Sequence, residues 1–112
     1  MGRNQFNGFG GGANMQQLMR QAQKLQEQMT KAQESVDERE FSAQAGGGMV
    51  SVTVSGKKEL KSIQINPQCV DPEDVEMLQD LILAAVNEAL RTAEETRSSE
   101  LSKLAPGMGG MF

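Results

Sequence analysis

The sequence predicts an α+β fold: a long N-terminal helix, a three-stranded antiparallel β-meander and a long C-terminal helix, in that order. Three observations predict it. Apolar residues recur in alternating steps of three and four from Met15 to Val36. Apolar and polar residues alternate over residues 50–55, and a helical pattern begins after Pro72 and continues to about Lys103. The first and third patterns are typical of amphipathic helices, and the second is typical of a strand with one buried face.

The N-terminal helix is predicted from a heptad stripe whose a and d positions stay apolar over about three heptads. Asn14 is the predicted N-cap, because its side chain can accept a hydrogen bond from a free backbone amide of the first turn. At ~1.5 Å per residue the helix would be on the order of 35 Å long, so its apolar face needs a second helix to cover it. The stripe consists of Met15, Leu18, Ala22, Leu25, Met29, Ala32 and Val36.

The meander is predicted from strands bounded by glycine. Glycines 46–48 permit a chain reversal between an extended 40–43 segment and the next strand. A strand follows them and no glycine-lysine-serine or glycine-lysine-threonine ending opens a helix, so this loop is not a phosphate-binding loop. Residues 56–57 supply the second turn. The three-residue step between Leu60 and Ile63 breaks the alternation of the third strand and predicts a β-bulge there.

The C-terminal helix is predicted to start at Asp71 and Pro72. Asp71 can act as the cap, and Pro72 suits the first helical position. Asp74 sits where the acid of a capping box reaches back to the cap. The helix is expected to end at about Lys103, and its predicted buried face consists of Val75, Leu78, Ile82, Ala85 and Ala89.

Composition predicts a single domain, residues 14–104, between a Gly/Asn-rich tail at 1–13 and a Gly/Met-rich tail at 105–112, both expected to be disordered. With 112 residues, 38% hydrophobic content and four Phe as the only aromatic residues, the core would be thin and oligomerisation is expected. The absence of a long apolar run predicts no membrane partner and a cytoplasmic location. The single Cys69 excludes an internal disulfide and fits a reducing compartment.

The residue types argue against an enzyme and against a metal site. The chain has no His and one Cys, so the common general base and the usual metal-ligand sets are missing. Acids cluster between Asp71 and Glu76, but the first turn of a helix attracts acids because of its dipole. We therefore expect no catalytic residue, no metal, no cofactor and no small-molecule substrate.

The order of these motifs resembles the YbaB/EbfC family of small bacterial nucleoid-associated DNA-binding proteins. The resemblance is carried by residues 45–57, by Asn66 and Pro67, and by the start of the helix at 71–78, and it covers roughly residues 15–104. It implies a homodimer whose helices project like the arms of tweezers. It also implies an architectural protein that binds double-stranded DNA, organises the nucleoid and affects transcription. A thin core and an uncovered sheet edge independently favour a homodimer.

Local charge, rather than total charge, decides where DNA would bind, because the formal net charge is −4. The acids concentrate after Asp71, and cations lie on both predicted helices. Counted at ~1.5 Å per residue, Arg20 and Arg91 are expected at a similar height above the sheet. Contacts would be mainly to phosphate, with little sequence preference. The predicted DNA-binding residues are Arg20, Lys24, Lys31, Arg91, Arg97 and Lys103.

An alternative function is a protein-interaction or chaperone-like adaptor that uses the helical arms without binding DNA. The Met-rich seams and the acidity of the chain favour it. The two functions differ in their response to substitution and salt. Replacing Arg20, Lys24 and Arg97 with alanine should abolish DNA binding and leave client binding intact.

Overall fold

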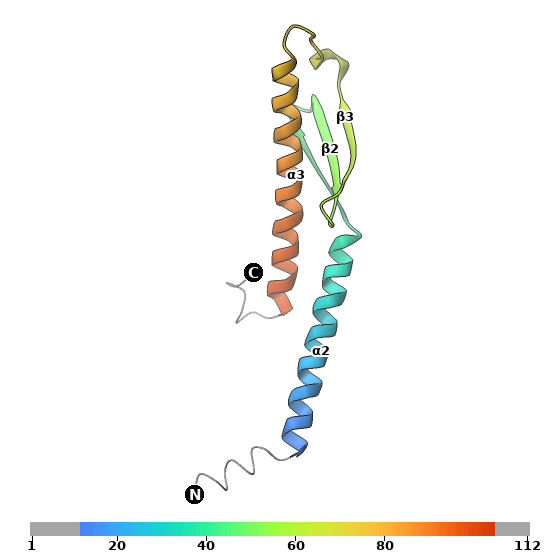
Figure 1. The fold of residues 1–112 in the computed structure, drawn as a ribbon, viewed down its shortest axis with the longest axis vertical. Helices are drawn as coiled ribbons and strands as arrows, with labels where there is room; N and C mark the ends of the chain where they lie inside the picture. The colour runs from blue at the N-terminus through green and yellow to red at the C-terminus, as the bar shows by residue number, and fades with distance from the viewer. Residues whose placement is uncertain (1–11, 105–112) are drawn as a thin grey trace, which may run out of the picture.

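The computed structural model describes residues 12–104 and confirms the predicted α+β fold (Figure 1). The tails predicted to be disordered lie outside the described residues, apart from the first two residues of the N-terminal helix. The elements in chain order are α2 (Gly12–Asp37), β1 (Glu40–Ala45), β2 (Val50–Ser55), β3 (Leu60–Ile65), the 3-10 helix η1 (Pro67–Cys69) and α3 (Val75–Leu104).

The three strands form one antiparallel sheet in the order β1-β2-β3. Three consecutive glycines, 46–48, make the β1–β2 turn, and all have positive φ angles of 65°, 67° and 93°, which glycine adopts without steric cost. On the other side of β2, Thr53 pairs with Ser62 and Val54 pairs with Leu60. The residue between Ser62 and Leu60 is therefore extra, which confirms the predicted bulge in β3.

The core lies between the sheet and α3. Val50, Val52 and Val54 of β2 are at most 1% exposed, and they face Ala85 and Ala89 of α3, which are fully buried. Because these alanines recur every four residues, the helix can lie close against the sheet. The prediction of buried positions is confirmed for both alanines, while Leu78 and Ile82 are half-buried at the edge of the contact.

The starts of both helices differ from the predictions. In α3 the cap is Asp74, whose Oδ1 accepts a hydrogen bond from Met77 N at 3.3 Å. Asp71 instead closes the preceding turn, because Glu73 N donates to its Oδ1 at 2.9 Å. The predicted cap was wrong by one turn, and Val75, the first helical residue, is exposed. Helix α2 begins at Gly12, so Asn14 lies inside the helix.

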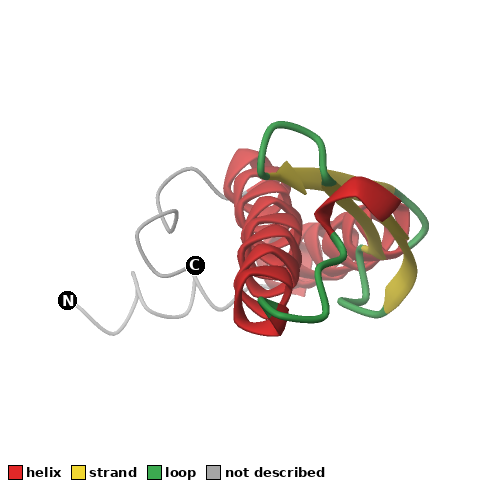
Figure 2. Ribbon diagram, turned by 90° about the horizontal axis from the view of Figure 1, so that it is seen from above, coloured by secondary structure: helices red, strands yellow, loops and turns green. Residues whose placement is uncertain are grey.

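The molecule is elongated, with principal extents of 82 × 23 × 16 Å. Figure 1 shows why: most of α3 runs along the sheet, and only its last turns lie beside α2. The view along the long axis shows the sheet as a second layer against one side of α3 (Figure 2). Helix α2 continues away from the sheet, past the end of α3, and residues 14–24 are all exposed. This free half of α2, residues 14–24, is called the arm below.

Candidate nucleic-acid interface

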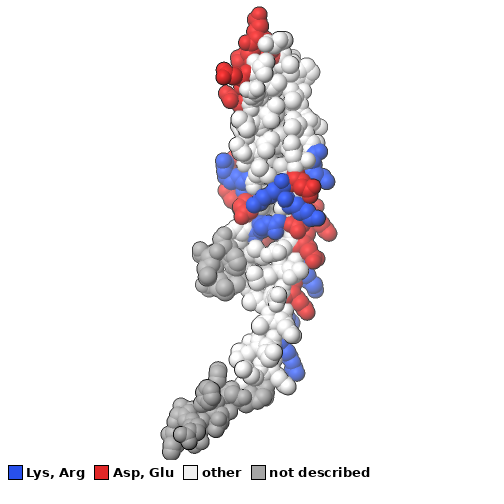
Figure 3. Space-filling view, viewed as in Figure 1, with Lys and Arg blue, Asp and Glu red and all other residues white. Residues whose placement is uncertain are grey.

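Three predicted site residues lie on one face of α2. Arg20, Lys24 and Lys31 are four and seven residues apart, spacings that stack side chains along one side of a helix. All three are exposed. The apolar stripe that includes Leu18 and Val36 occupies the opposite face. Lys and Arg side chains follow one edge of α2 below the sheet, with acids between them nearer the sheet (Figure 3).

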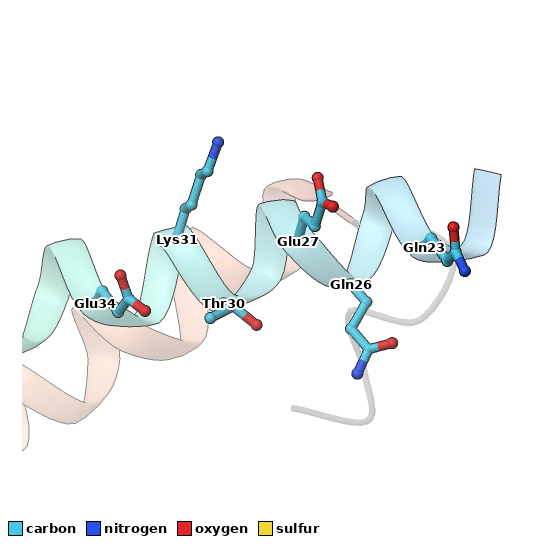
Figure 4. A pocket seen from close by; sticks show the side chains of 6 residues that line it. All are labelled: Gln23, Gln26, Glu27, Thr30, Lys31 and Glu34. Carbon is cyan, nitrogen blue, oxygen red and sulfur yellow. The ribbon is translucent and has the colours of Figure 1, made fainter. Parts of the chain in front are cut away.

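Polar side chains surround these cations. Gln17 and Gln21 border a surface hollow with Arg20 and Lys24. A second hollow, closer to the sheet, is lined by both charges and amides, and its Lys31 and Glu27 extend from the same side of α2 while Gln26 points to the other (Figure 4). Its lining residues are Gln23, Gln26, Glu27, Thr30, Lys31 and Glu34. Such a surface suits an extended polar partner.

The predicted site residues of α3 each have a carboxylate partner. Arg91 pairs with Glu88, and Lys103 pairs with Glu100 at 3.5 Å. Arg97 pairs with Asp37 at the end of α2. Within residues 12–104, by contrast, no ion pair involves Arg20, Lys24 or Lys31. The available positive charge among the predicted residues therefore lies on α2.

The predicted equal height of Arg20 and Arg91 was wrong. The pair between Arg97 and Asp37 aligns the two helices, and from that level Arg91 lies toward the sheet while Arg20 lies away from it. At ~1.5 Å per residue the two are about 35 Å apart along the long axis. The reason is that α3 runs along the sheet through Ala85, Ala89 and Ala93 instead of leaving it at its first turn. One chain does not bring the six predicted residues together.

Further cations lie near the base of α2, and sequence reasoning did not assign them to the site. Arg39 lies over the Phe41 ring, 5.4 Å from its centroid, and borders a hollow shared with Lys57 and Lys61. Four acids line the same hollow, so its charge is mixed; they are Asp37, Glu38, Glu40 and Glu59. The sequence could have indicated Arg39, because it follows the end of α2 by only two residues and so must lie near the base of that helix.

Lys58 is neutralised by an ion pair with α3. Its Nζ lies 2.6 Å from Glu94 Oε2, and this hydrogen bond, reinforced by the charges of Lys58 and then Arg97, lowers the pKa of Glu94 below its usual value. Both side chains are about half exposed, so solvent screens the pair and it contributes little to stability. It joins the β2–β3 turn to α3.

Within residues 12–104 no group of three or more His, Cys, Asp or Glu residues could hold a metal ion. In the same range no helix is long and apolar enough to cross a membrane. What the fold offers is a polar, partly cationic surface on a projecting helix. Fold and surface together describe a small α+β protein whose projecting helix presents an extended polar surface to a partner.

The chain belongs to the YbaB/EbfC DNA-binding family, whose family model matches residues 11–108. It is 58% identical over 114 residues to a nucleoid-associated protein of Clostridium novyi, with both chains fully covered. It is 53% identical over 111 residues to a nucleoid-associated protein of Ruminiclostridium cellulolyticum, covering 99% of this chain and 96% of that protein. The family binds DNA and is not enzymatic, which confirms both predictions at that level.

A solved structure supports the fold. An uncharacterized protein from Helicobacter pylori is similar with a TM-score of 0.58 and 28% sequence identity, covering 70% of this chain and 90% of that chain. The nucleoid association predicted from the sequence agrees with the relatives from Clostridium novyi and Ruminiclostridium cellulolyticum, both of which are nucleoid-associated proteins.

Proposed function

We propose that this protein binds duplex DNA mainly through backbone phosphates, using the outer face of α2, and so contributes to nucleoid organisation and gene regulation. One observation carries the proposal: Arg20, Lys24 and Lys31 are exposed, share one helix face and have no carboxylate partner within the described residues. Cations that need not break an ion pair gain most when they displace the counterions of phosphate. Family membership supports the same partner.

Little sequence preference is expected. The sequence has no Tyr or Trp to stack on bases, and the amides of Gln17 and Gln21 beside the cations can donate to phosphate oxygens as readily as to base edges. The contacts predicted from the sequence for Arg91, Arg97 and Lys103 are not part of this proposal, since each residue would have to exchange its carboxylate for a phosphate.

A fluorescence-anisotropy titration of a duplex of about thirty base pairs, repeated between about 50 and 200 mM salt, tests this function. We expect saturable binding that weakens steeply with salt. If a homodimer uses three α2 cations from each chain, six phosphate contacts give a logarithmic salt slope of about −5 and an affinity loss on the order of a thousandfold across that range. A second duplex of unrelated sequence should bind about equally. No binding at low salt would refute the proposal.

We also propose that the chain acts as a homodimer joined through β3 and the neighbouring face of α3. Ile63 pairs with Val52 and therefore lies on the same sheet face as the buried valines. Helix α3 covers β1 and β2 but leaves the apolar side chains of β3 accessible: Leu60 is 48% exposed, Ile63 40% and Ile65 37%. Among residues 12–104 no strand lies beside the outer edge of β3.

A second copy of the chain fits this surface best. Leu83 of α3 is 59% exposed, which adds to the apolar area that one chain leaves in water. A two-fold arrangement would cover both copies with one self-complementary contact and would remove the sheet edge. It would also place two α2 arms on one particle, which is the arrangement the DNA proposal uses.

The Ile63→Asp variant is expected to dissociate the dimer, because it places a charge on the apolar surface that would be buried. Light scattering after size-exclusion chromatography should give twice the chain mass of 12.1 kDa for the wild type and that mass itself for the variant. Ser62→Asp is the matched control, since Ser62 pairs with Thr53 on the opposite sheet face. A wild-type protein that elutes as a monomer at high micromolar concentration would contradict the dimer.

The protein-binding adaptor stays a second candidate because of the arm. Met15, Leu18 and Met19 are 52%, 50% and 60% exposed there, and exposed Met-rich surfaces suit protein clients. The salt titration separates the two functions, since apolar client binding depends weakly on salt.

A further inference from the structure

The end of α2 is fixed by one arginine from α3. The Nη2 group of Arg97 donates to Oδ1 of Asp37, the last residue of α2, and also to the carbonyl oxygen of Gly56 at 2.7 Å. Gly56 directly follows β2. The side chains of Arg97 and Asp37 are only 23% and 28% exposed, so the contact is partly shielded from solvent. A single guanidinium thus ties together α2, α3 and the β2–β3 turn.

Backbone contacts reinforce the same place. Gly56 N donates to Arg39 O at 3.0 Å, just beyond α2. The Cα of Gly56 lies so close to α2 that a Cβ there would be 1.8 Å from the Val36 carbonyl oxygen. The Val36 side chain is 1% exposed in the core. We call this group, Val36, Asp37, Gly56 and Arg97, the joint.

The arm beyond the joint has little other support. Residues 14–24 are all exposed, whereas Met29 and Ala32, nearer the joint, are half-buried. The direction of the arm therefore depends on the joint and on the short stretch where α2 lies beside the last turns of α3 (Figure 1). A small rotation at the joint would be magnified at Arg20.

We propose that Arg97 is a positioning residue that sets the direction of the arm, and with it the placement of the α2 cations, and that it is not a phosphate ligand. A planar guanidinium satisfies both acceptors of the joint with fixed geometry. Turning Arg97 toward phosphate would leave the Asp37 carboxylate and the Gly56 carbonyl without this donor in a partly shielded place. The expected effect of Arg97 on DNA affinity rests on the proposed function, whereas its expected effect on the direction of the arm does not.

The two roles of Arg97 predict opposite results for Asp37→Ala. If Arg97 were a phosphate ligand, Asp37→Ala would remove the carboxylate that competes with phosphate for it and would strengthen DNA binding. If it positions the arm, affinity falls, by on the order of fivefold, while the salt slope stays unchanged because no phosphate contact is removed. Arg97→Lys keeps the charge but replaces the planar Nη2 group, whose two N–H bonds have fixed directions, with an ammonium on a flexible stem, and it should weaken binding in the same way. Stronger binding of Asp37→Ala would overturn the proposal.

A distance measurement tests the joint without DNA. Spin labels at exposed Gln23 on the arm and Gln64 on the sheet, in a Cys69→Ala background and diluted with unlabelled protein, report the angle of the arm. We expect a narrow distance distribution that broadens in both Asp37→Ala and Arg97→Lys, with the circular-dichroism helix signal retained. An unchanged distribution in both variants would refute the positioning role. If the wild type fails to bind DNA but the distribution broadens, the proposed function fails and the joint stands.

Discussion

The Gly56→Ala variant is expected to lose roughly 3 kcal/mol of unfolding free energy. The added Cβ would lie 1.8 Å from the Val36 carbonyl oxygen, 2.5 Å from its carbonyl carbon and 2.9 Å from Asp37 Cα. All three are backbone atoms, so no side-chain rotation can relieve the overlap. The β2–β3 turn and the end of α2 would have to separate, which would also weaken the contacts of Arg97 with both.

Urea unfolding at a fixed protein concentration measures this loss, since the proposed dimer makes stability depend on concentration. Gly47→Ala is the matched control: apart from its two chain neighbours, no described residue has an atom within 4 Å of the added Cβ, but the φ of Gly47 is +67°. That variant should lose about 1 kcal/mol, from backbone conformation alone. Equal losses in the two variants would show that the close approach at Gly56 does not constrain the fold.

The predicted strands were confirmed because their signal is local. Alternation over residues 50–55 specifies which side chains of β2 are buried, and the step from Leu60 to Ile63 marks an irregularity in the sequence pattern itself. The glycines at 46–48 indicate a turn that other residues adopt with strain. Each of these features depends on neighbours within a few residues.

The start of α3 could not be fixed in the same way. Asp71 and Asp74 are both good caps, and both do accept a backbone amide hydrogen bond, but one closes a turn and the other starts the helix. Local propensity does not choose between them. The choice depends on where α3 meets the sheet, through Ala85 and Ala89, which is a tertiary property.

In the candidate site, too, the features that depend on local spacing were predictable and the contacts between distant residues were not. The shared face of Arg20, Lys24 and Lys31 follows from helical spacing and was predictable. The partner of Arg97 was not, because Asp37 is sixty residues away in the sequence. The Arg91 and Lys103 pairs involve acids three residues earlier, so a sequence signal existed for them.

Replacing Arg20, Lys24 and Lys31 together with glutamine is expected to reduce DNA affinity by on the order of a hundredfold or more at about 100 mM salt. Six positive charges would be removed from a homodimer. Removing each cation that meets a phosphate should reduce the logarithmic salt slope by about 0.9, so the slope should approach zero. Glutamine keeps good helix propensity, and the three positions are exposed, so the unfolding free energy should change by less than about 0.5 kcal/mol.

The double variant Arg91→Gln/Lys103→Gln is the matched control, because it removes exposed cations from α3 that already pair with acids. Its affinity for DNA should fall less than about threefold. Glu88 and Glu100, which lose their partners, would repel phosphate only weakly because solvent and salt screen exposed charges. If the α3 variant loses as much as the α2 variant, both helices contact DNA as the sequence predicted. If the α2 variant keeps the affinity and salt slope of the wild type, the outer face of α2 is not the interface. The phosphate contacts would then be made by other cations, such as Arg39, Lys57 and Lys61 near the base of α2.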